Sequence, residues 1–513
     1  MSSVLTGTVL LTAVGLFSQL IGFFYRILLS RLIGAETMGL YQLVMPVYSM
    51  LMSVTAVGLT VAVATLSAKF SALKDHGAIR DTLRKAVGCF FLAAVPLGVM
   101  VIAASDPISA YLIGDARTRL GIVLLVPCVL LTGVENLHKH CFYGIGRVGP
   151  PAASEMAEQI VRAAAVLGLL LILRPRTGEQ RVGVIVAGMV VCEVCSALTL
   201  TLLFRRHWRV DPPGRAIHSV TRGQLVKLAV PVSMTSLLGT LLGSANAVLI
   251  PARLVAGGME AGAAMAAFGV MCGMTMPLLA MPTGFVGSLC LTMVPDLARR
   301  TAGGDRRAAG QFLDRVLSVT SLLMAPAMAL LAVIGPAVGQ LVYREPTVGG
   351  HMTWLAVGTL LSCYQTVLGG ALNGLGLQNL GARNAIASDI VQLGFTYVAI
   401  FRWGLAGFTA GFVLSSLVGM GMNLVSVLRA TGGKPQMYRW FVRPLLGASL
   451  AWGWCRLLFR ILERGNCPLW GNCLICVGMG LVIYGASLQA QGVAFPDVMP
   501  RLKGLRRRAI RRS

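Results

Sequence analysis

The sequence predicts an all-α polytopic membrane protein with about fourteen transmembrane helices, and two observations lead to this fold class. Hydrophobic residues make up 56% of the 513 residues and charged residues only 12%, whereas a soluble globular chain carries roughly 25% charged residues. Four long runs carry no charge, at 228–252, 261–295, 352–382 and 403–428. Because about 20 apolar residues span the hydrocarbon core as a helix, each run is long enough to cross a bilayer.

Hydropathy and helix breakers place the helices in order along the chain. The predicted ranges are 4–30, 38–67, 84–105, 120–142, 153–173, 182–204, 225–251, 263–295, 312–335, 351–373, 384–401, 404–428, 438–461 and 469–490. The first helix has no basic segment before it and no cleavage pattern after it, so it is expected to be a retained span rather than a signal peptide.

An internal repeat organises these helices into two pseudo-symmetric lobes. SRLIGAE at 30–36 returns as ARLVAGG at 252–258, and the Gly144-x-Gly146 pair returns as Gly374-x-Gly376. The two offsets are similar, which predicts an N-lobe of six helices at 1–210, a linker at 211–224 and a C-lobe of six helices at 225–430. Two further helices follow at 431–495, and a basic tail occupies 496–513.

The positive charges predict the orientation in the membrane. Most of the 44 Lys and Arg residues lie on the side of the N-terminus, in clusters near 69–85, 139–147, 205–227, 299–315, 429–443 and 501–512. Basic residues in short loops stay cytoplasmic, so both termini are expected inside. The net charge of +25 is therefore read as contact with anionic inner-leaflet phospholipid rather than with nucleic acid.

Two of the predicted spans contain residues that are costly to bury in lipid. The span 153–173 holds Glu158 and Arg162, and the span 384–401 holds Asp389 and Gln392 near the positions that the repeat would assign to that pair. Such residues normally face a polar cavity or a partner. Glu158 and Arg162 are one helical turn apart, so they either serve a cavity or pair with each other and fix helix packing.

Arg26 follows a long uncharged segment in the first helix, and two interpretations of it stay open. Its guanidinium either contacts an anionic substrate, with Gln19 two turns earlier on the same face, or extends to the lipid headgroups beside Arg31. Asn246 lies in an otherwise apolar span, where it either binds substrate or bonds a neighbouring helix. Glu193 in the sixth span is a candidate for ion coupling or for a structural partner.

Arg31 and Arg253 occupy equivalent places in the repeat, and each precedes an acidic residue, Glu36 and Glu260 respectively. We expect these four residues at an outer gate or interface. Lobes related by a repeat, with polar residues between them, are one layout of alternating-access transporters.

Several stretches resemble the stage V sporulation protein B family, a branch of the multidrug/oligosaccharidyl-lipid/polysaccharide exporter superfamily. They are YRILLSRLIGAETMGLYQLVMPVYSMLMSVTAVGL at 25–59, AASEMAEQIVRA at 152–163, LVKLAVPVSMTSLLGTLLGSANAVLIPARL at 225–254 and MPLLAMPTGFVGSLCLTMVPDLA at 276–298. The resemblance implies a fourteen-helix flippase in the bacterial cytoplasmic membrane. Its implied cargo is a saccharide on undecaprenyl pyrophosphate, such as a peptidoglycan precursor, and its implied role is in cell-wall or spore-cortex assembly.

The chain departs from the related lipid II flippases in its basic residues. Those proteins carry several cavity arginines in helices 1, 2 and 8, whereas the first helix here has Gln19, Tyr25 and the single Arg26, and the other two have none. The acidic residue usual in helix 7 is replaced by Asn246. A dense arginine clamp for pyrophosphate therefore does not carry over.

Other functions are weighed against a flippase. A cation-coupled multidrug-type exporter would need acidic residues near the middle of helices 1, 2, 7 and 8, where this chain has none. A membrane-bound glycosyltransferase needs catalytic groups on a large outer loop, and the loops here are short. A non-transporting scaffold of cell-wall assembly, acting with cell-wall synthases, stays open. We expect no enzyme activity, no catalytic residues, no cofactor and no metal site.

Overall fold

The computed structural model describes residues 2–210, 218–302, 306–433, 435–465 and 467–492. Half of the predicted linker, residues 211–217, and the whole basic tail lie outside these residues. Within the described ranges every regular element is a helix, as the sequence predicts. The fold class is therefore confirmed.

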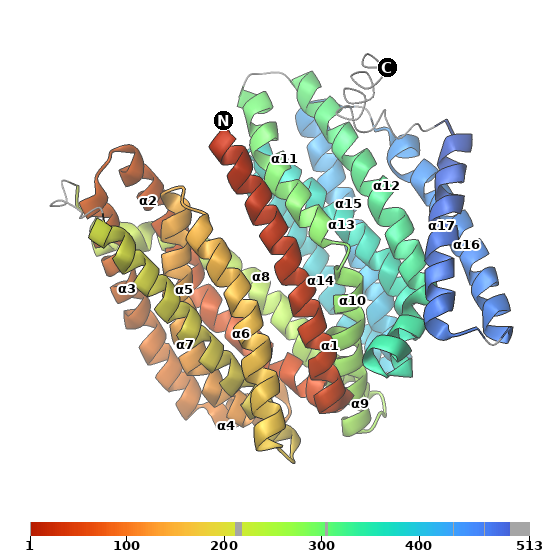
Figure 1. Cartoon of the computed structure of the whole chain (residues 1–513), viewed down its shortest axis with the longest axis horizontal. Helices are drawn as coiled ribbons and strands as arrows, with labels where there is room; N and C mark the ends of the chain where they lie inside the picture. Colours follow the sequence, from red (N-terminus) through yellow and green to blue (C-terminus); the bar gives the residue numbers. More distant parts are fainter. Residues whose placement is uncertain (1, 211–217, 303–305, 434, 466, 493–513) are drawn as a thin grey trace. The chain divides into compact units, whose positions relative to one another are not determined.

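The helices follow one another with short connections (Figure 1). They are α1 (Ser2–Met52), α2 (Gly58–Ala72), α3 (His76–Ala103), α4 (Ser105–Pro107), α5 (Arg119–Gly144), α6 (Gly149–Leu173), α7 (Gly178–Val210), α8 (Arg222–Ala256), α9 (Ala261–Phe268), α10 (Met276–Ala280), α11 (Gly284–Ala302), α12 (Arg306–Val338), α13 (Met352–Gly374), α14 (Gln378–Trp403), α15 (Leu405–Thr431), α16 (Arg443–Arg464) and α17 (Leu469–Ala490). Short π or 3-10 segments join or extend several of them: η1 (Ser53–Val57), η2 (Ile108–Ile113), η3 (Ala116–Thr118), η4 (Gly269–Thr275), η5 (Gly339–Tyr343), η6 (Pro346–Gly349) and η7 (Tyr438–Val442).

Thirteen helical segments of the described chain are long and apolar enough to cross a membrane. The first of them, Phe17–Ala72, is 56 residues long, about twice the length that one crossing needs. Counted as two crossings, it brings the total into agreement with the fourteen predicted from hydropathy.

The first long segment is divided at Gly34. This residue has φ +79° and ψ 172°, which interrupts the helical backbone of α1. The hydroxyl groups of Tyr25 and Tyr41 interact electrostatically, although 16 residues of continuous helix would separate them by about 24 Å. The chain therefore turns back near Gly34, which brings Tyr25 and Tyr41 from the two arms of α1 close to each other.

By its internal contacts the chain divides into two compact units, Met1–Gly273 and Met274–Ser513. In the first unit the helices approach very closely at small residues. A Cβ built on Gly58 would lie 2.1 Å from the Ala229 carbonyl oxygen of α8, and one built on Gly269 would lie 2.0 Å from that of Ala35 in α1. Such contacts are typical of helix packing in membranes. In this unit α8 and α9 thus pack on α1 and α2.

The second unit is held by polar bonds between its inner helices. Asn384 of α14 donates to the Asn423 side-chain oxygen of α15 at 3.0 Å, and Ser388 donates to the Ser415 carbonyl at 2.7 Å. The last two helices, α16 and α17, pack on each other and on α12 around an apolar cluster that includes Cys455 and Cys476.

The internal repeat is visible in the backbone of both units. Positive φ angles recur at Gly114 and Arg344, at Gly146 and Gly376, and at Arg174 and Gly404, each pair being 230 residues apart in the sequence. The ends of α5 and α13 are also closed by matching bonds, from Arg147 N to the Phe142 carbonyl and from Leu377 N to the Leu372 carbonyl. The two halves of the chain therefore interrupt their helices at corresponding positions. The lobe limits at 210 and 225 stay a prediction.

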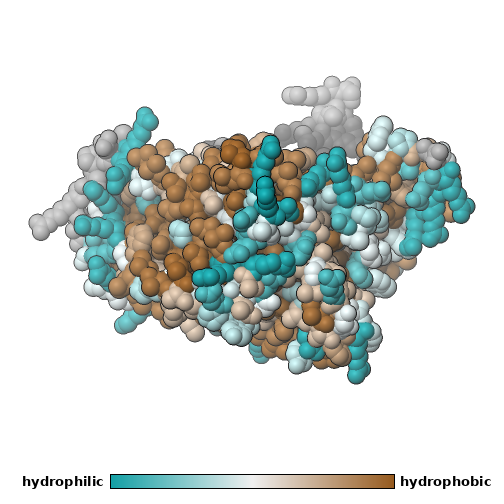
Figure 2. Space-filling model, turned by 90° about the horizontal axis from the view of Figure 1, so that it is seen from below, coloured by the Kyte–Doolittle hydropathy of each residue, from teal (hydrophilic) through white to brown (hydrophobic). Residues whose placement is uncertain are grey.

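Large apolar side chains are exposed over much of the surface, as a lipid-facing protein requires. Ile172 of α6 is 77% exposed and Leu92 of α3 is 73% exposed. Figure 2, a view from below the orientation of Figure 1, shows exposed hydrophobic side chains over part of this side, with hydrophilic side chains between them and at the rim.

Candidate functional site

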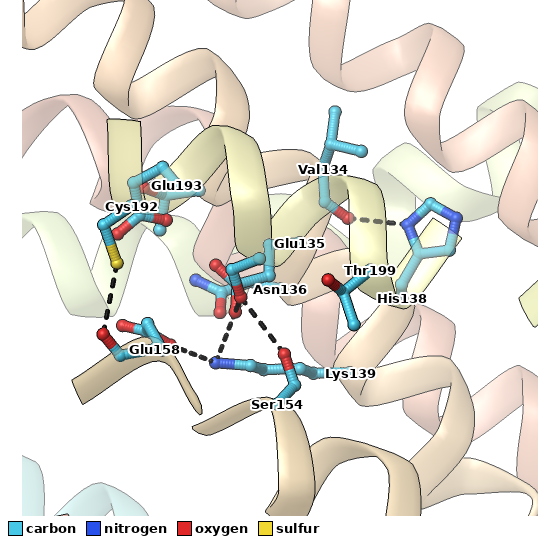
Figure 3. A network of polar contacts seen from close by, with 12 residues as sticks. Val134, Glu135, Asn136, His138, Lys139, Ser154, Glu158, Cys192, Glu193 and Thr199 are labelled. Carbon is cyan, nitrogen blue, oxygen red and sulfur yellow. Dashed lines mark hydrogen bonds and ion pairs between the residues drawn. The ribbon is translucent and has the colours of Figure 1, made fainter. Parts of the chain in front are cut away.

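A network of buried charges joins α5, α6 and α7, which lie side by side in the first unit (Figures 1 and 3). On α5, Glu135 and Lys139 are one turn apart, and the Lys139 ammonium lies 2.7 Å from the Glu135 carboxylate. The same ammonium reaches Glu158 of α6 at 2.9 Å. Lys139 therefore ties two carboxylates from two helices.

Arg162 extends the network to a third helix. Its guanidinium pairs with Glu158 one turn earlier on α6 and with Glu193 of α7, the latter at 3.2 Å. The Cys192 thiol beside Glu193 donates to the Glu158 backbone carbonyl at 3.2 Å. Glu158 and Arg162 thus do pair with each other, as the four-residue spacing allows, but each also has a second charged partner that the spacing could not reveal.

Hydroxyl groups complete the contacts of this network. Ser196 of α7 donates to Glu135 at 2.5 Å and is itself 3.1 Å from the Ser154 hydroxyl of α6. Glu135 and Glu193 are each only 1% exposed. Buried ions persist only when they are paired and hydrogen-bonded, so the network fixes the packing of three membrane helices whatever else it does.

Arg26 lies on α1 close to this network but outside its ion pairs. Among the described residues no carboxylate forms an ion pair with it, and its electrostatic partners are the hydroxyls of Tyr25 and Tyr41, which also interact with Arg162. Arg26 precedes the break at Gly34 by eight residues, about 12 Å along the helix. The sequence predicted the end of this helix at residue 30, so Arg26 lies further from the end of the helix than expected. Its guanidinium would therefore have to extend further to contact the lipid headgroups.

Several buried donors on α1 and α6 have no acceptor among the described residues. They are the Ser18 hydroxyl, the Tyr25 hydroxyl and Arg162 Nε. Ser18, Gly22 and Tyr25 share one face of α1, and a Cβ on Gly22 would lie 3.6 Å from the Gln159 side-chain oxygen of α6. A buried donor without a partner costs roughly 1–3 kcal/mol. Unpartnered donors of this kind can bind an anion.

The other predicted binding residues are placed as follows. Gln19 is half-buried on α1. Asn246 of α8 donates to the Leu242 carbonyl of its own helix at 3.3 Å. In the second unit Asp389 is half-buried on α14, and Gln392 is buried, where it accepts from Ser415 of α15 at 3.0 Å. Gln392 therefore serves the contact between α14 and α15.

The four predicted gate residues all belong to the first unit. Glu36, just after the break in α1, pairs with Arg117 at 2.6 Å. A Cβ on Gly262 would be 3.7 Å from Glu36 and 3.8 Å from Glu260, so these two carboxylates flank the start of α9. Arg31 is exposed near the end of the first arm of α1, and Arg253 is half-buried near the end of α8.

Two members of the network, Glu135 and Lys139, were not predicted as site residues. The sequence reasoning counted Lys139 among cytoplasmic cations, but the side chain is only 13% exposed and lies in two ion pairs. The available signal was a second acid–base pair at a four-residue spacing, next to the predicted pair of Glu158 and Arg162 along the chain. Because Arg147 follows Lys139 closely in the sequence, both were assigned to one cytoplasmic cluster and the pair of Glu135 and Lys139 was overlooked.

The geometry can now be set beside known proteins. The model of the family described as "Polysaccharide biosynthesis protein" matches residues 4–298. The chain belongs to this family. The chain is similar in sequence to the stage V sporulation protein B of Bacillus subtilis (strain 168). The two are 24% identical over 434 residues, which cover 83% of this chain and 82% of the relative. The lipid II flippase MurJ of the same organism is 19% identical over 76% of each chain.

Solved structures show the same fold for this member of the polysaccharide biosynthesis protein family. The lipid II flippase MurJ in its inward closed conformation matches with a TM-score of 0.71 and 12% identity, over 93% of this chain and 98% of that chain. An inward-facing multidrug resistance MATE family transporter of the MOP superfamily matches with a TM-score of 0.64 and 13% identity, over 83% and 100%. The chain is thus a multi-pass membrane protein with a MurJ- and MATE-like fold, and the family resemblance seen in the sequence is confirmed.

Proposed function

We propose that this protein is a flippase that moves an undecaprenyl-pyrophosphate-linked saccharide across the bacterial cytoplasmic membrane by alternating access. Its similarity to the stage V sporulation protein B and to MurJ supports a lipid-linked saccharide as cargo. A peptidoglycan precursor, with use in the spore cortex, is the finer proposal. No chemical step is needed for such a movement, so we propose no enzyme activity.

One observation carries the proposal: among the described residues Arg26 has no carboxylate partner, and the neighbouring Tyr25 hydroxyl and Arg162 Nε are buried without acceptors. A pyrophosphate headgroup is anionic and strongly hydrated, so a protein that moves it must replace its water with donors and cations. Arginine binds phosphate oxygens through two parallel hydrogen bonds. We place the phosphate contact at Arg26 and at the free Nε of Arg162, with Tyr25 and Ser18 as hydroxyl donors.

The test is an export assay in a bacterium whose own lipid II flippase is depleted. The chain is expressed in this host, and labelled precursor is measured on the outer face of the membrane. We expect precursor to appear there, and to be lost with Arg26→Ala at an equal level of protein in the membrane. If wild type and Arg26→Ala both leave the precursor inside, the cargo is not a peptidoglycan precursor.

A multidrug-type exporter of organic cations is the alternative. The acids that would bind such a cation in the first unit are Glu135, Glu158 and Glu193, and all three already contact Lys139 or Arg162. An organic cation would have to displace a bound ammonium or guanidinium group. Efflux of a fluorescent organic cation that survives Arg26→Ala would favour this alternative. A non-transporting scaffold would neither export the labelled precursor nor expel the organic cation, so both assays would be negative.

We further propose that both termini lie in the cytoplasm. In the first unit, the start of α1, the turn after α2 and the turn after α5 lie at one end (Figure 1). Basic residues are frequent at this end, among them Lys69, Lys74, Arg80, Arg84 and Arg147. By the positive-inside rule this end faces the cytoplasm and its anionic phospholipid.

A further inference from the structure

Two buried carboxyl groups in the charged network lie close to each other. Glu135 on α5 and Glu193 on α7 are each only 1% exposed, and their carboxyl groups interact electrostatically. An ionised carboxylate only accepts hydrogen bonds, whereas a protonated one also donates. Two ionised groups in this position would repel, which favours one proton shared between them.

The partners of each oxygen indicate which residue holds this proton. Glu135 Oε1 accepts from Lys139 at 2.7 Å and from Ser196 at 2.5 Å. Glu193 Oε1 accepts from Arg162 at 3.2 Å, and its Oε2 is buried with no partner among the described residues. Glu135 has the donors that stabilise an ionised carboxylate. Glu193 Oε2 is the free position for a proton.

The charge balance of the network agrees with this assignment. Three carboxyl groups, Glu135, Glu158 and Glu193, contact two cations, Lys139 and Arg162. If every group were ionised, these ion pairs would carry one excess negative charge inside the membrane helices, because Arg26 lies nearby but forms no ion pair with the three carboxylates. An uncompensated buried charge costs several kcal/mol, and one bound proton removes the excess.

We propose that Glu193 and Glu135 share one exchangeable proton, donated by Glu193 Oε2 to the Glu135 carboxylate, so that the first unit contains a proton-binding site. On release, the O–H bond of Glu193 breaks, its electron pair stays on the carboxylate, and the proton passes to water. The charged and titratable groups that interact with Glu193 are Glu135 on α5, Glu158 and Arg162 on α6, Cys128 on α5, Cys192 on α7 and Tyr48 on α1.

Arg162 connects this proton to the proposed anion contact, and this step rests on the proposed function. The guanidinium neutralises Glu193 through Nη2 and leaves Nε without an acceptor. A phosphate that draws Arg162 towards Arg26 takes the cation away from Glu193 and so favours its protonated form. Since linkage is reciprocal, a bound proton then strengthens anion binding by the same factor.

The shared proton is tested by infrared spectroscopy of the full-length protein in detergent, as a function of pH. We expect a carboxylic-acid C=O band near neutral pH that disappears at alkaline pH. Glu193→Gln and Glu135→Gln should each lose this band. A glutamine at 193 still donates a hydrogen bond to Glu135, so the first variant is expected to fold. Glu155→Gln is the matched control: this residue also lies on α6 but belongs to none of the ion pairs of the network, so the variant should keep the band.

A wild-type spectrum without this band, or one that Glu193→Gln leaves unchanged, overturns the proton site. The link to the anion is tested with sulfate, which does not itself titrate near neutral pH. At the alkaline pH at which half of the band is lost, adding sulfate to the weakly buffered protein should cause proton uptake in the wild type and none in Glu193→Gln. Absence of uptake in the wild type overturns the link. The infrared band does not depend on export, so a failed export assay with an intact band rejects the proposed cargo and not the proton site.

Discussion

Lys139 on α5 lies 2.9 Å from Glu158 on α6, although the two residues are 19 positions apart in the sequence. The contact places a cation between two acids of different helices, because Glu135 lies on its other side at 2.7 Å. It makes the acid–base pair of α6 one part of a larger network. A single ammonium group therefore joins α5 and α6, and Arg162 extends the network to α7.

The first prediction concerns the loss of this ammonium. Lys139→Met leaves Glu135 without its cation and removes one of the partners of Glu158, both inside membrane helices. Removing one partner of a buried ion pair typically costs about 3–5 kcal/mol, so we expect a clear fall in the thermal unfolding temperature of the detergent-solubilised protein. Arg299→Met is the control, since its pair with Asp296 is largely exposed and such pairs contribute little. Equal unfolding temperatures in both variants would contradict the network.

The second prediction concerns the pair of Glu158 and Arg162. If they only paired with each other, exchanging the two residues would restore the stability lost in either single variant. In the structure an arginine at 158 would face Lys139, and a glutamate at 162 would face Glu193. We therefore expect the Glu158→Arg, Arg162→Glu double variant to be at least as destabilised as either single change. Rescue in a thermal unfolding assay would show an isolated pair.

The third prediction separates phosphate contact from headgroup contact at Arg26. Arg26→Ala should abolish export at an unchanged protein level, and Arg26→Lys should restore only part of it, because an ammonium lacks the two parallel donors of a guanidinium. Arg456→Ala is the control, as this residue also lies within a span but stacks on Trp452 of its own helix. Equal export by wild type and both Arg26 variants would favour contact with lipid headgroups.

Much of the fold could be predicted because its signals are local. Uncharged runs mark the spans, and the repeat around Gly146 and Gly376 reflects a real backbone requirement, since both residues have φ near +75°. The number of membrane crossings could be predicted because each crossing has its own uncharged run. What hydropathy could not show is that the segment from Phe17 to Ala72 is nearly continuous helix, broken at one glycine and one π segment.

The site was predictable only where partners are one turn apart. Glu158 and Arg162 were found from their spacing, but the contacts of Lys139 with Glu158 and of Arg162 with Glu193 join different helices. A single sequence does not contain the helix packing that creates such contacts. Gln392 shows the converse limit: a polar residue within a span was read as a binding residue, and in the structure it bonds Ser415 of the next helix.

The fourth prediction concerns the break in α1. At Gly34, φ is +79°, in the region where a residue with a Cβ is strained, at a cost of about 1–3 kcal/mol. Nothing lies within 4 Å of the position of an added Cβ, so the cost would come from the backbone alone. Gly34→Ala should lower the thermal unfolding temperature and weaken the contact of Tyr41 with the other arm of α1. Gly168→Ala, within the helix α6 and equally free of neighbours, should leave that temperature unchanged or slightly raised. If both alanines behaved alike, Gly34 would not be the residue that reverses the chain.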